Sequence, residues 1–292
     1  MSERLALQPH LQGLAHGRRL DAAEAEEAFG IILDDGATPA QIAGLLMAMR
    51  VRGESAVELA GAVRAMRKRM KTVSAPDDAF DNCGTGGDGQ HTWNISTAAA
   101  FVLAGAGVHV AKHGNRAASS KSGTSDVLAA LGIKVEQTPG DVTRILSAGG
   151  IAFMFAPAFH PALASVAPVR KELGVRTLFN LVGPLANPAG VKRQLIGAGS
   201  QEAADSIAGV VAELGTEATW VVHGAGGLDE LSTLGESRVH AIENGKRRTF
   251  FVSPEDAGLA RARIDDLRGG DPADNAAALL ALLDGAKGAY RR

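Results

Sequence analysis

The sequence predicts an α/β protein in which a small, discontinuous all-helical domain accompanies a larger α/β domain with a mostly parallel central sheet flanked by helices. Residues 1–72 repeat apolar side chains at helical spacing without any strand pattern, whereas from residue 75 short apolar segments alternate with helical ones. Hydrophobic residues make up 46% of the chain but aromatic residues only 4%, and there are 36 glycines. An aliphatic core with many turns and close helix contacts suits a layered protein.

The N-terminal segment carries the start and stop signals of helices. Thr38, Pro39 and Gln41 supply an N-cap, a proline at the first helical position and a capping-box glutamine, and Gly53 supplies a stop. The next helix is expected to end near residue 73, after a basic run between residues 64 and 71. A solvated helix face with cations near its C-terminus explains this run, and a nucleic-acid patch is the alternative. The apolar stripes consist of Ala22, Ala25, Ala28, Phe29, Ile32 and Leu33, and of Ile42, Leu45, Leu46 and Met49.

The later part of the chain is expected to build the sheet. Residues 165–183 interrupt its alternating pattern, because they are predicted to be helical and to fold back onto the N-terminal helices. We therefore predict one domain from residues 1–72 joined by about 165–190, and a second from 73–164 and 191–292, with a hinge between them. The predicted strands are 108–111, 151–155, 195–198 and 219–222, the predicted helices are 125–131, 140–147 and 201–214, and a β-hairpin is predicted at 238–244 and 247–252.

Composition and charge argue against several classes of protein. The net charge is only −2, which gives no general attraction for nucleic acid. The longest apolar runs are too short and too rich in glycine and alanine to span a bilayer, and the N-terminus lacks a secretory signal pattern, so we expect a cytoplasmic protein. Cys83 is the only cysteine, which excludes an internal disulfide and a cysteine zinc cluster and favours packing over a nucleophilic role.

The run DNCGTGGDGQHTWNIST, residues 81–97, predicts a site for an anion such as phosphate. Its four glycines, Gly84, Gly86, Gly87 and Gly89, allow main-chain N–H groups to approach a ligand without an intervening side chain. The next stretch, residues 95–105, is apolar and helix-prone, so the N–H groups of a helix N-terminus are expected to point at the same place.

A dinucleotide-binding loop is the first alternative, since GTGGDG also satisfies G-x-G-x-x-G. That motif follows a solidly apolar strand and needs an acidic residue about 20 positions later for the ribose hydroxyls. Here DDAFDNC precedes the loop, and the next strand ends in Lys112 and His113. A cation in place of the acid favours phosphate over a ribose diol, and a purely structural glycine turn is the other alternative.

Three further clusters follow predicted strands, where open α/β sheets bind their ligands. KHGNRAASSKSG, residues 112–123, offers an ammonium group and neutral hydrogen-bonding groups, although its serines fit a loop and N-cap equally well. His160 and Arg170 follow another strand; an arginine fork suits a carboxylate, and an ordinary surface contact is the alternative. Asp229 and Glu230 resemble a Mg²⁺ site, against the alternative of solvated loop acids.

Taken together, GTGGDG…TWNIST, KHGNRAASSKSG, HPA…PVRKELGVRT, FNLVGPLANP and HG…GLDE resemble the anthranilate phosphoribosyltransferase family, in the family's order and over nearly the whole chain. The resemblance implies transfer of a phosphoribosyl group from phosphoribosyl pyrophosphate to the amine of anthranilate, with Mg²⁺ as cofactor and pyrophosphate as the second product. It also implies a helical domain and an α/β domain with the site in the cleft between them, and a homodimer formed through the helical domains.

The resemblance also implies the site residues. Those expected at phosphoribosyl pyrophosphate are Gly84, Thr85, Gly86, Gly87, Asp88, Asn94, Ser96, Thr97, Lys112, Ser120 and Thr124. Those expected at anthranilate are Gly84, His113, Asn115, His160, Arg170 and Gly183, with Arg170 at the carboxylate and with Asn115 and His113 orienting the amine. Those expected at Mg²⁺ are Ser96, Asp229 and Glu230.

Three other functions compete with this interpretation. A pyrimidine nucleoside phosphorylase-like enzyme shares the architecture, but a His/Asn/Arg pocket for an aromatic acid argues against it. The near-neutral charge and the set of Lys112, Asp229 and Glu230 argue against a non-catalytic relative that binds nucleic acid, and a nicotinamide oxidoreductase lacks its acidic residue. Family members usually continue beyond the point where this chain stops, at GAKGAYRR, so part of the covering of the sheet is expected to be absent. Trp93 stands where phenylalanine is common.

Overall fold

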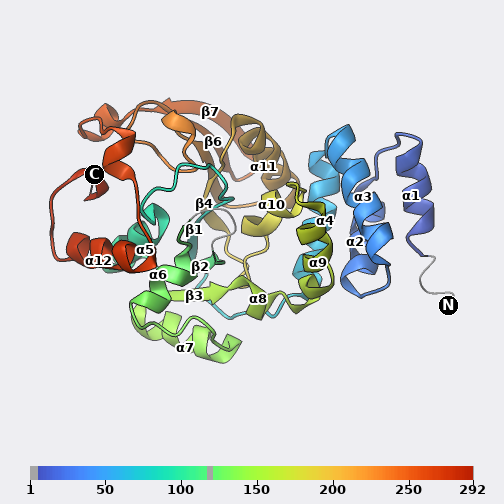
Figure 1. The fold of residues 1–292 in the computed structure, drawn as a ribbon, viewed down its shortest axis with the longest axis horizontal. Coiled ribbons are helices and arrows are strands. Elements are labelled where there is room, and N and C mark those ends of the chain that lie inside the picture. Colours follow the sequence, from blue (N-terminus) through green and yellow to red (C-terminus); the bar gives the residue numbers. More distant parts are fainter. Residues whose placement is uncertain (1–5, 117–120, 292) are drawn as a thin grey trace.

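The computed structural model describes residues 6–116 and 121–291, which form two lobes (Figure 1). The sheet and its covering helices form the lobe at the left of the view, and the first helices form the lobe at the right. This arrangement confirms the predicted fold class, a small helical part beside a larger α/β part. The N-terminal helices are α1 (Gln8–Ala15), α2 (Ala22–Leu33), α3 (Pro39–Arg52) and α4 (Ala56–Arg69).

The predicted start and end of α3 are both confirmed. Thr38 Oγ1 accepts the Gln41 N–H at 3.3 Å, and Gln41 Oε1 accepts the Thr38 N–H at 2.8 Å. The two bonds form a capping box, with proline at the first position of the helix. Gly53 is the C-cap with a φ of 84°, a left-handed value that favours glycine.

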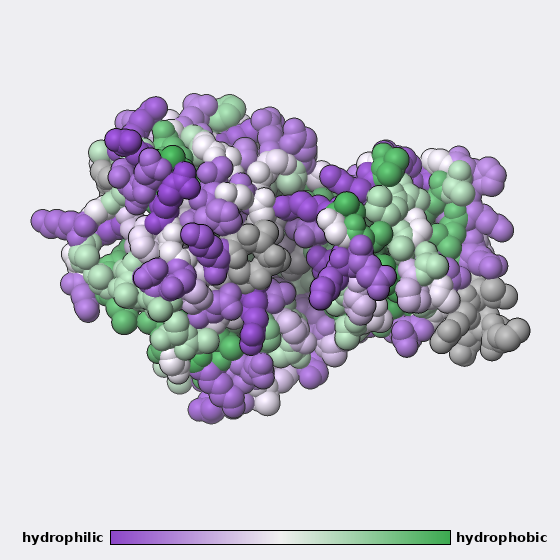
Figure 2. Space-filling model, viewed as in Figure 1, coloured by the Kyte–Doolittle hydropathy of each residue, from purple (hydrophilic) through white to green (hydrophobic). Residues whose placement is uncertain are grey.

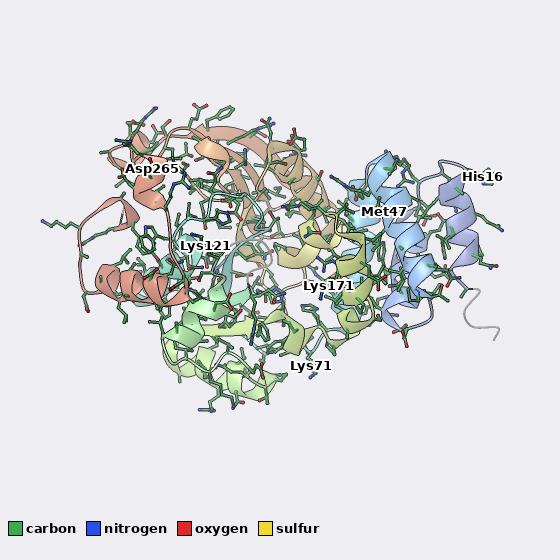
Figure 3. The ribbon with its side chains drawn as sticks, in the orientation of Figure 1. His16, Met47, Lys71, Lys121, Lys171 and Asp265 are labelled. Atoms are coloured by element: carbon green, nitrogen blue, oxygen red, sulfur yellow. The ribbon has the colours of Figure 1, made fainter. Side chains whose placement is uncertain are left out.

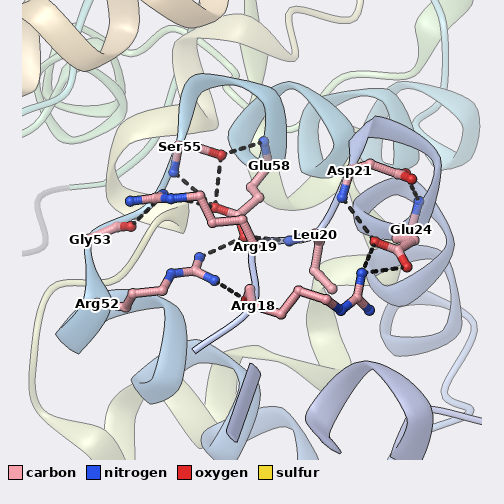
Figure 4. A network of polar contacts seen from close by, with 9 residues as sticks. All are labelled: Arg18, Arg19, Leu20, Asp21, Glu24, Arg52, Gly53, Ser55 and Glu58. Carbon is pink, nitrogen blue, oxygen red and sulfur yellow. Dashed lines mark hydrogen bonds and ion pairs between the residues drawn. The ribbon is translucent and has the colours of Figure 1, made fainter. Parts of the chain in front are cut away.

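Glu58, on α4, ties the helical lobe together (Figure 4). Its carboxylate is fully buried and accepts the Leu20 N–H at 2.9 Å and the Ser55 N–H at 2.9 Å. The Arg52 guanidinium also donates to it at 2.6 Å. Burial by itself would raise the pKa of Glu58, but these hydrogen bonds outweigh it and the pKa is lowered. The carboxylate therefore remains charged and joins α3, α4 and the segment before α2.

The described residues include one sheet of seven strands, in the order β3-β2-β1-β4-β5-β6-β7. The first five strands run parallel, and β6 and β7 form the predicted antiparallel hairpin. β1 lies inside the sheet, between β2 and β4, and pairs with β4 from Phe80, opposite Arg193, to Gly84, opposite Gly197. The strands are β1 (Phe80–Gly84), β2 (Val110–Gly114), β3 (Ile151–Phe155), β4 (Arg193–Gly197), β5 (Ala218–His223), β6 (Ser237–Glu243) and β7 (Lys246–Val252).

The inner strand β1 is absent from the sequence prediction because it is polar where a buried parallel strand is usually apolar. Asp81 and Asn82 are both buried in it. Each side chain has a partner: Asn187 Nδ2 donates to Asp81 Oδ2 at 2.8 Å, and Asn82 Nδ2 donates to the Ser96 carbonyl at 2.7 Å, whereas Asn82 Oδ1 has no partner in the described ranges. Hydrogen bonding thus allows polar side chains inside the sheet.

Helices cover both faces of the sheet. α7 (Pro139–Gly149) packs with Met154 of β3, whereas α6 (Thr124–Ala130) packs with the neighbouring Phe153. Because successive strand residues face opposite sides, the two helices lie on opposite faces. α5 (Ile95–Gly105) shares a cluster with α6 and with α12 (Pro272–Leu283), a helix that the sequence prediction omits. The helix predicted over residues 201–214 is α11 (Gln201–Leu214), with the same ends.

Residues 165–183 are helical in large part, as predicted, and pack against the N-terminal helices. The segment contains α9 (Ala167–Leu173) and α10 (Phe179–Val182). Val169 and Phe179 belong to the same hydrophobic cluster as α2, α3 and α4, and the Phe179 ring meets Phe29 edge to face, with centroids 5.9 Å apart. That cluster continues into α11, so the two lobes share apolar contacts. The domain boundaries and the hinge stay a prediction.

Both lobes expose some large apolar side chains. In Figure 2 hydrophilic and apolar residues are mixed over both lobes, and apolar residues are visible over the N-terminal helices. Val51, on α3, is 82% exposed. Within the described ranges, no helix combines the length and the apolar character that crossing a bilayer would require.

Candidate active site

The glycine-rich loop follows the carboxyl end of β1. Gly86 and Gly87 have φ values of 65° and 75°, in the left-handed region that residues with side chains disfavour. The loop is anchored to the next strand, because the Thr85 N–H donates to the Gly197 carbonyl at 2.9 Å. The backbone needed for close approach of a ligand is therefore present.

The turn after β5 brings Asp229 directly against this loop. The Gly86 N–H donates to Asp229 Oδ2 at 3.0 Å. A Cβ on Gly84 would lie 2.3 Å from the same oxygen, and a Cβ on Gly197 would lie 1.6 Å from the Asp229 carbonyl oxygen. Glycine at the ends of two neighbouring strands therefore makes the space in which Asp229 sits.

Asp88, Asp229 and Glu230 concentrate negative charge at this edge of the sheet. Burial raises the pKa of Asp229 to about 6, and the charge of Asp88 adds to the shift. Burial also raises the pKa of Glu230 to about 8, with a further contribution from Asp229 and an opposing one from Lys112. The nearby groups thus supply too little positive charge to balance these carboxylates. In the ranges 6–116 and 121–291, no three His, Cys, Asp or Glu side chains are arranged to hold a metal by themselves.

Two N–H groups at the N-terminus of α5 are bonded within the protein, whereas the sequence predicted that this helix end points its N–H groups at a ligand. The Ile95 N–H donates to the Trp93 carbonyl at 2.7 Å, and the Thr97 N–H donates to the Asn94 carbonyl at 3.1 Å. The Ser96 backbone lies close enough to the Glu230 carboxyl group to oppose the rise of its pKa. Binding of an anion at this helix end stays a prediction.

Lys112 lies beneath the loop, at 4% exposure. Its ammonium group donates to the Asn82 carbonyl. Burial raises the pKa values of Asp81 and Glu230, and the charge of Lys112 opposes this rise. The structure thus places Lys112 among the carboxylates of β1 and of the turn after β5, and its contact with phosphate stays a prediction.

His113 and His160 form an uncharged, buried pair, with His113 in β2 and His160 shortly after β3. Their rings are 5.1 Å apart. Burial lowers the pKa of His113 to about 3, with further contributions from His160 and Lys112, and burial lowers the pKa of His160 to about 4. The nearby backbone of Gly183 opposes the shift of the His113 pKa, and that of Ala186 opposes the shift of the His160 pKa. Their Nε2 atoms are buried and have no hydrogen-bond partner within the described ranges.

A neutral imidazole carries one acceptor nitrogen, so each of the two rings can accept one hydrogen bond from a ligand. The structure therefore brings together three of the residues predicted at the acceptor substrate: His113, His160 and Gly183.

Arg170, on α9, has a guanidinium without a carboxylate partner in the described part of the chain. The group lies over the Phe179 ring, 5.5 Å from its centroid, and burial lowers its pKa. Figure 3 labels the adjacent Lys171 on the same helix, in the region between the lobes. Asn115 is exposed, and its Oδ1 accepts the Arg116 N–H at 2.8 Å. Ser120 lies outside the described residues.

The remaining predicted residues meet on the other side of the loop. Thr97 Oγ1 and Thr124 Oγ1 are 3.0 Å apart and share a hydrogen bond. The Asn94 side chain does not cap α5 but binds elsewhere: its Nδ2 donates to the Ser122 carbonyl at 3.2 Å. Asn94, Thr97 and Thr124 thus connect the N-terminus of α5 to the segment that leads into α6.

The sequence analysis missed Arg176, which joins the two lobes at the loop. From the connection between α9 and α10, Arg176 Nη1 donates to the Gly87 carbonyl at 3.1 Å and, more weakly, to the Gly86 carbonyl at 3.4 Å. A Cβ on Gly87 would lie 2.0 Å from this nitrogen. In the sequence, Arg176 is marked only by its position in the PVRKELGVRT motif, from which Arg170 was predicted as the carboxylate-binding residue.

Comparison with known proteins gives matches over nearly the whole chain. The family model described as "Glycosyl transferase family, helical bundle domain" matches residues 8–70, and "Glycosyl transferase family, a/b domain" matches residues 76–292. An anthranilate phosphoribosyltransferase of Afipia carboxidovorans is 56% identical over 281 residues, which cover 96% of this chain and 83% of that protein.

Solved structures agree with this result. The crystal structure of an anthranilate phosphoribosyltransferase from Thermus thermophilus superimposes with a TM-score of 0.90 at 44% identity, over 96% of this chain and 84% of that one. The enzyme of Saccharomyces cerevisiae, solved in complex with PRPP and Mg, gives a TM-score of 0.85 at 29% identity, over 94% of this chain and 80% of that one. The same yeast enzyme is also solved with 4-fluoroanthranilate. The chain therefore belongs to the anthranilate phosphoribosyltransferases of this glycosyl transferase family.

Proposed function

We propose that this protein transfers the phosphoribosyl group from phosphoribosyl pyrophosphate to the amine of anthranilate and releases pyrophosphate, as a step of tryptophan biosynthesis. The names of its relatives support the reaction. The site itself also supports the reaction, because two unlike groups of residues lie near the ends of neighbouring strands. One is the glycine loop at the end of β1 with its adjacent carboxylates, and the other is the pair of uncharged histidines near the ends of β2 and β3.

The donor would be bound by the loop and by the residues on its far side. Backbone N–H groups of a glycine loop suit phosphate oxygens. The proposed set is Gly84, Thr85, Gly86, Gly87, Asp88, Asn94, Ser96, Thr97, Lys112 and Thr124, together with Ser120 outside the described ranges.

The carboxylates beside the loop fit a divalent cation. Burial raises the pKa values of Asp229 and Glu230, neighbouring carboxylates add to the rise, and a cation would favour the charged form of both groups. Mg²⁺ is commonly held by one or two carboxylates, with water and substrate phosphates as its other ligands, so the lack of a third side chain arranged as a ligand in the described ranges is no obstacle. We assign Asp229, Glu230 and Ser96 to it. When bound, Mg²⁺ supplies Lewis-acid neutralisation of the pyrophosphate leaving group.

Anthranilate would be held by its two polar groups. Arg170 offers a guanidinium that lacks a carboxylate partner in the described part of the chain, and bidentate binding of a carboxylate suits its fork. The neutral rings of His113 and His160, whose buried Nε2 atoms have no partner in the described ranges, would accept the two N–H bonds of the aromatic amine. Gly84 and Gly183 would line the pocket, and Asn115 would join it from the exposed loop.

In the reaction the amine nitrogen forms a bond to the anomeric carbon while the bond from that carbon to the pyrophosphate oxygen breaks. The nitrogen becomes positively charged and loses a proton, which a neutral histidine ring is in position to accept before it passes to solvent. Neutral histidines favour this course, because a protonated ring would repel the developing cation. Burial of the two rings also keeps water away from the sugar carbon, where it would compete with the amine.

The homodimer and the cellular location belong to the same proposal. Apolar residues visible over the N-terminal helices, with Val51 82% exposed, support dimerisation through this lobe. The single cysteine supports a cytoplasmic location.

The experiment that tests the proposal is the loss of anthranilate fluorescence on addition of phosphoribosyl pyrophosphate and Mg²⁺. We expect the fluorescence to decay at a rate proportional to protein, and to persist when Mg²⁺ is chelated. No decay in a folded sample, judged by a cooperative thermal transition, would refute the proposed reaction.

A further inference from the structure

A buried asparagine on α12 is hydrogen-bonded to the side chain of Asn94. Asn275 is 2% exposed. Its Nδ2 donates to Asn94 Oδ1 at 2.7 Å, and its own Oδ1 accepts the Gly270 N–H at 2.8 Å. Both functional groups of this amide are therefore engaged, one with the turn before α12 and one with a residue proposed to bind phosphoribosyl pyrophosphate.

The hydrogen bonds form a chain with a defined direction. A backbone N–H, that of Gly270, can only donate, so it fixes the oxygen of Asn275 and turns the Asn275 NH₂ group toward Asn94. Asn94 then presents its oxygen to Asn275 at 2.7 Å, and the same oxygen accepts a longer hydrogen bond, of 3.4 Å, from Ser122 Oγ. Its NH₂ group faces the Ser122 carbonyl, which can only accept, at 3.2 Å. A backbone group at each end thus sets the orientation of both amides.

The orientation matters because an asparagine amide is nearly symmetric in shape and opposite in polarity at its two ends. Asn94 Nδ2 carries two N–H bonds, and one of them goes to Ser122. The other remains for an anionic or hydroxyl-rich ligand. If the amide were turned over, the ligand would meet an oxygen acceptor instead.

The segment around Asn275 is also joined to the glycine-rich run by its backbone. The Trp93 N–H donates to the Leu267 carbonyl at 2.9 Å, and the Gly269 N–H donates to the His91 carbonyl at 2.9 Å. α12 is therefore held against the residues that precede Asn94.

We propose that Asn275 is a positioning residue that orients the Asn94 side chain for binding phosphoribosyl pyrophosphate. This inference rests on the proposed function. Asn275 does not contact the substrate, and it acts through Asn94.

The test replaces Asn275 by aspartate. Asn275→Asp keeps the shape and the oxygen that accepts the Gly270 N–H, but it places an oxygen against Asn94 Oδ1. We expect the Kd and KM for phosphoribosyl pyrophosphate to rise about tenfold, the effect of one lost hydrogen bond, with the anthranilate KM unchanged. Asn275→Ala removes the hydrogen bond without adding a charge. If the buried carboxylate of Asn275→Asp prevents folding, Asn275→Ala replaces it in the test, with the same expected rise of Kd and KM. Asp274→Asn is the matched control, since it changes the neighbouring capping residue, which bonds to Asp271, and should leave both constants unchanged.

A second comparison separates positioning from general stability. In an Asn94→Ala background, Asn275→Asp should change the Kd for phosphoribosyl pyrophosphate by less than about twofold, because the group it orients is gone. An unchanged Kd in the folded single variant, or effects that multiply in the double variant, would overturn the inference. Binding of phosphoribosyl pyrophosphate is measured by calorimetry with Mg²⁺ and without anthranilate, so it does not depend on the transfer reaction. A wild type that binds the donor but transfers nothing would therefore refute the proposed reaction and leave the role of Asn275 standing. A wild type that does not bind the donor overturns both.

Discussion

Replacing Arg170 by alanine should weaken the binding of anthranilate specifically. The guanidinium lies 5.5 Å from the Phe179 centroid, is partly buried, and has no carboxylate partner in the described ranges, so a substrate carboxylate would be its main charged contact. A hydrogen bond to a charged group contributes about 1.5 to 3 kcal/mol. The anthranilate KM should therefore rise roughly 10- to 150-fold, with the KM for phosphoribosyl pyrophosphate unchanged.

The assay is steady-state anthranilate fluorescence at saturating phosphoribosyl pyrophosphate and Mg²⁺. Lys171→Ala is the matched control, because this exposed cation lies next to Arg170 on the same helix and should leave the KM unchanged (Figure 3). Aniline lacks the carboxylate, so wild type and Arg170→Ala should use it equally poorly. An anthranilate KM within twofold of wild type, or an equal loss with aniline, would remove Arg170 from the carboxylate site.

Three further predictions concern other parts of the site. His160 has a pKa of about 4 in the folded protein, against an ordinary value near 6.5, so on acidification the unfolded chain takes up this proton first. The contribution of His160 to the free energy of unfolding is therefore fully present above pH 6.5 and falls by about 1.4 kcal/mol per pH unit between pH 6.5 and pH 4. Urea titrations should find a shallower fall of stability with pH in His160→Gln. Gly87→Ala should lower the stability by roughly 1 to 2 kcal/mol because of its φ of 75°, and it should also raise the KM for phosphoribosyl pyrophosphate by displacing Arg176. The control is Gly174→Ala, which has a φ of 63° and open space around it and should lower the melting temperature only. Equal KM values in the two variants would contradict this prediction. Asp229→Asn should abolish Mg²⁺-dependent turnover, and full activity would refute the metal assignment.

Most of the helices and every strand except β1 could be predicted from the sequence because their signals are local. The capping box at Thr38 and the ends of α11 follow from nearest neighbours in the chain, and both are present in the structure. β1 could not be predicted in this way. Its polar residues, Asp81 and Asn82, are stabilised by Asn187 and by the Ser96 carbonyl, which are distant in sequence.

The same distinction applies to the candidate site. The glycine loop and the Asp229–Glu230 pair can be identified in the sequence as motifs, but their contact depends on the end of β1 meeting the turn after β5. The neutral state of His113 likewise depends on burial, which no motif reports. Arg176 and Asn275 were missed because their partners are backbone carbonyls and a second amide, and neither arrangement leaves a pattern in the chain.

The central claim is that a donor loop and an acceptor pocket meet in one site, so that pyrophosphate leaves only when anthranilate attacks. The direct measurement is pyrophosphate release from phosphoribosyl pyrophosphate and Mg²⁺, with and without anthranilate. We expect one pyrophosphate for each anthranilate consumed and almost none without anthranilate. Release at the same rate in the absence of anthranilate would contradict the claim.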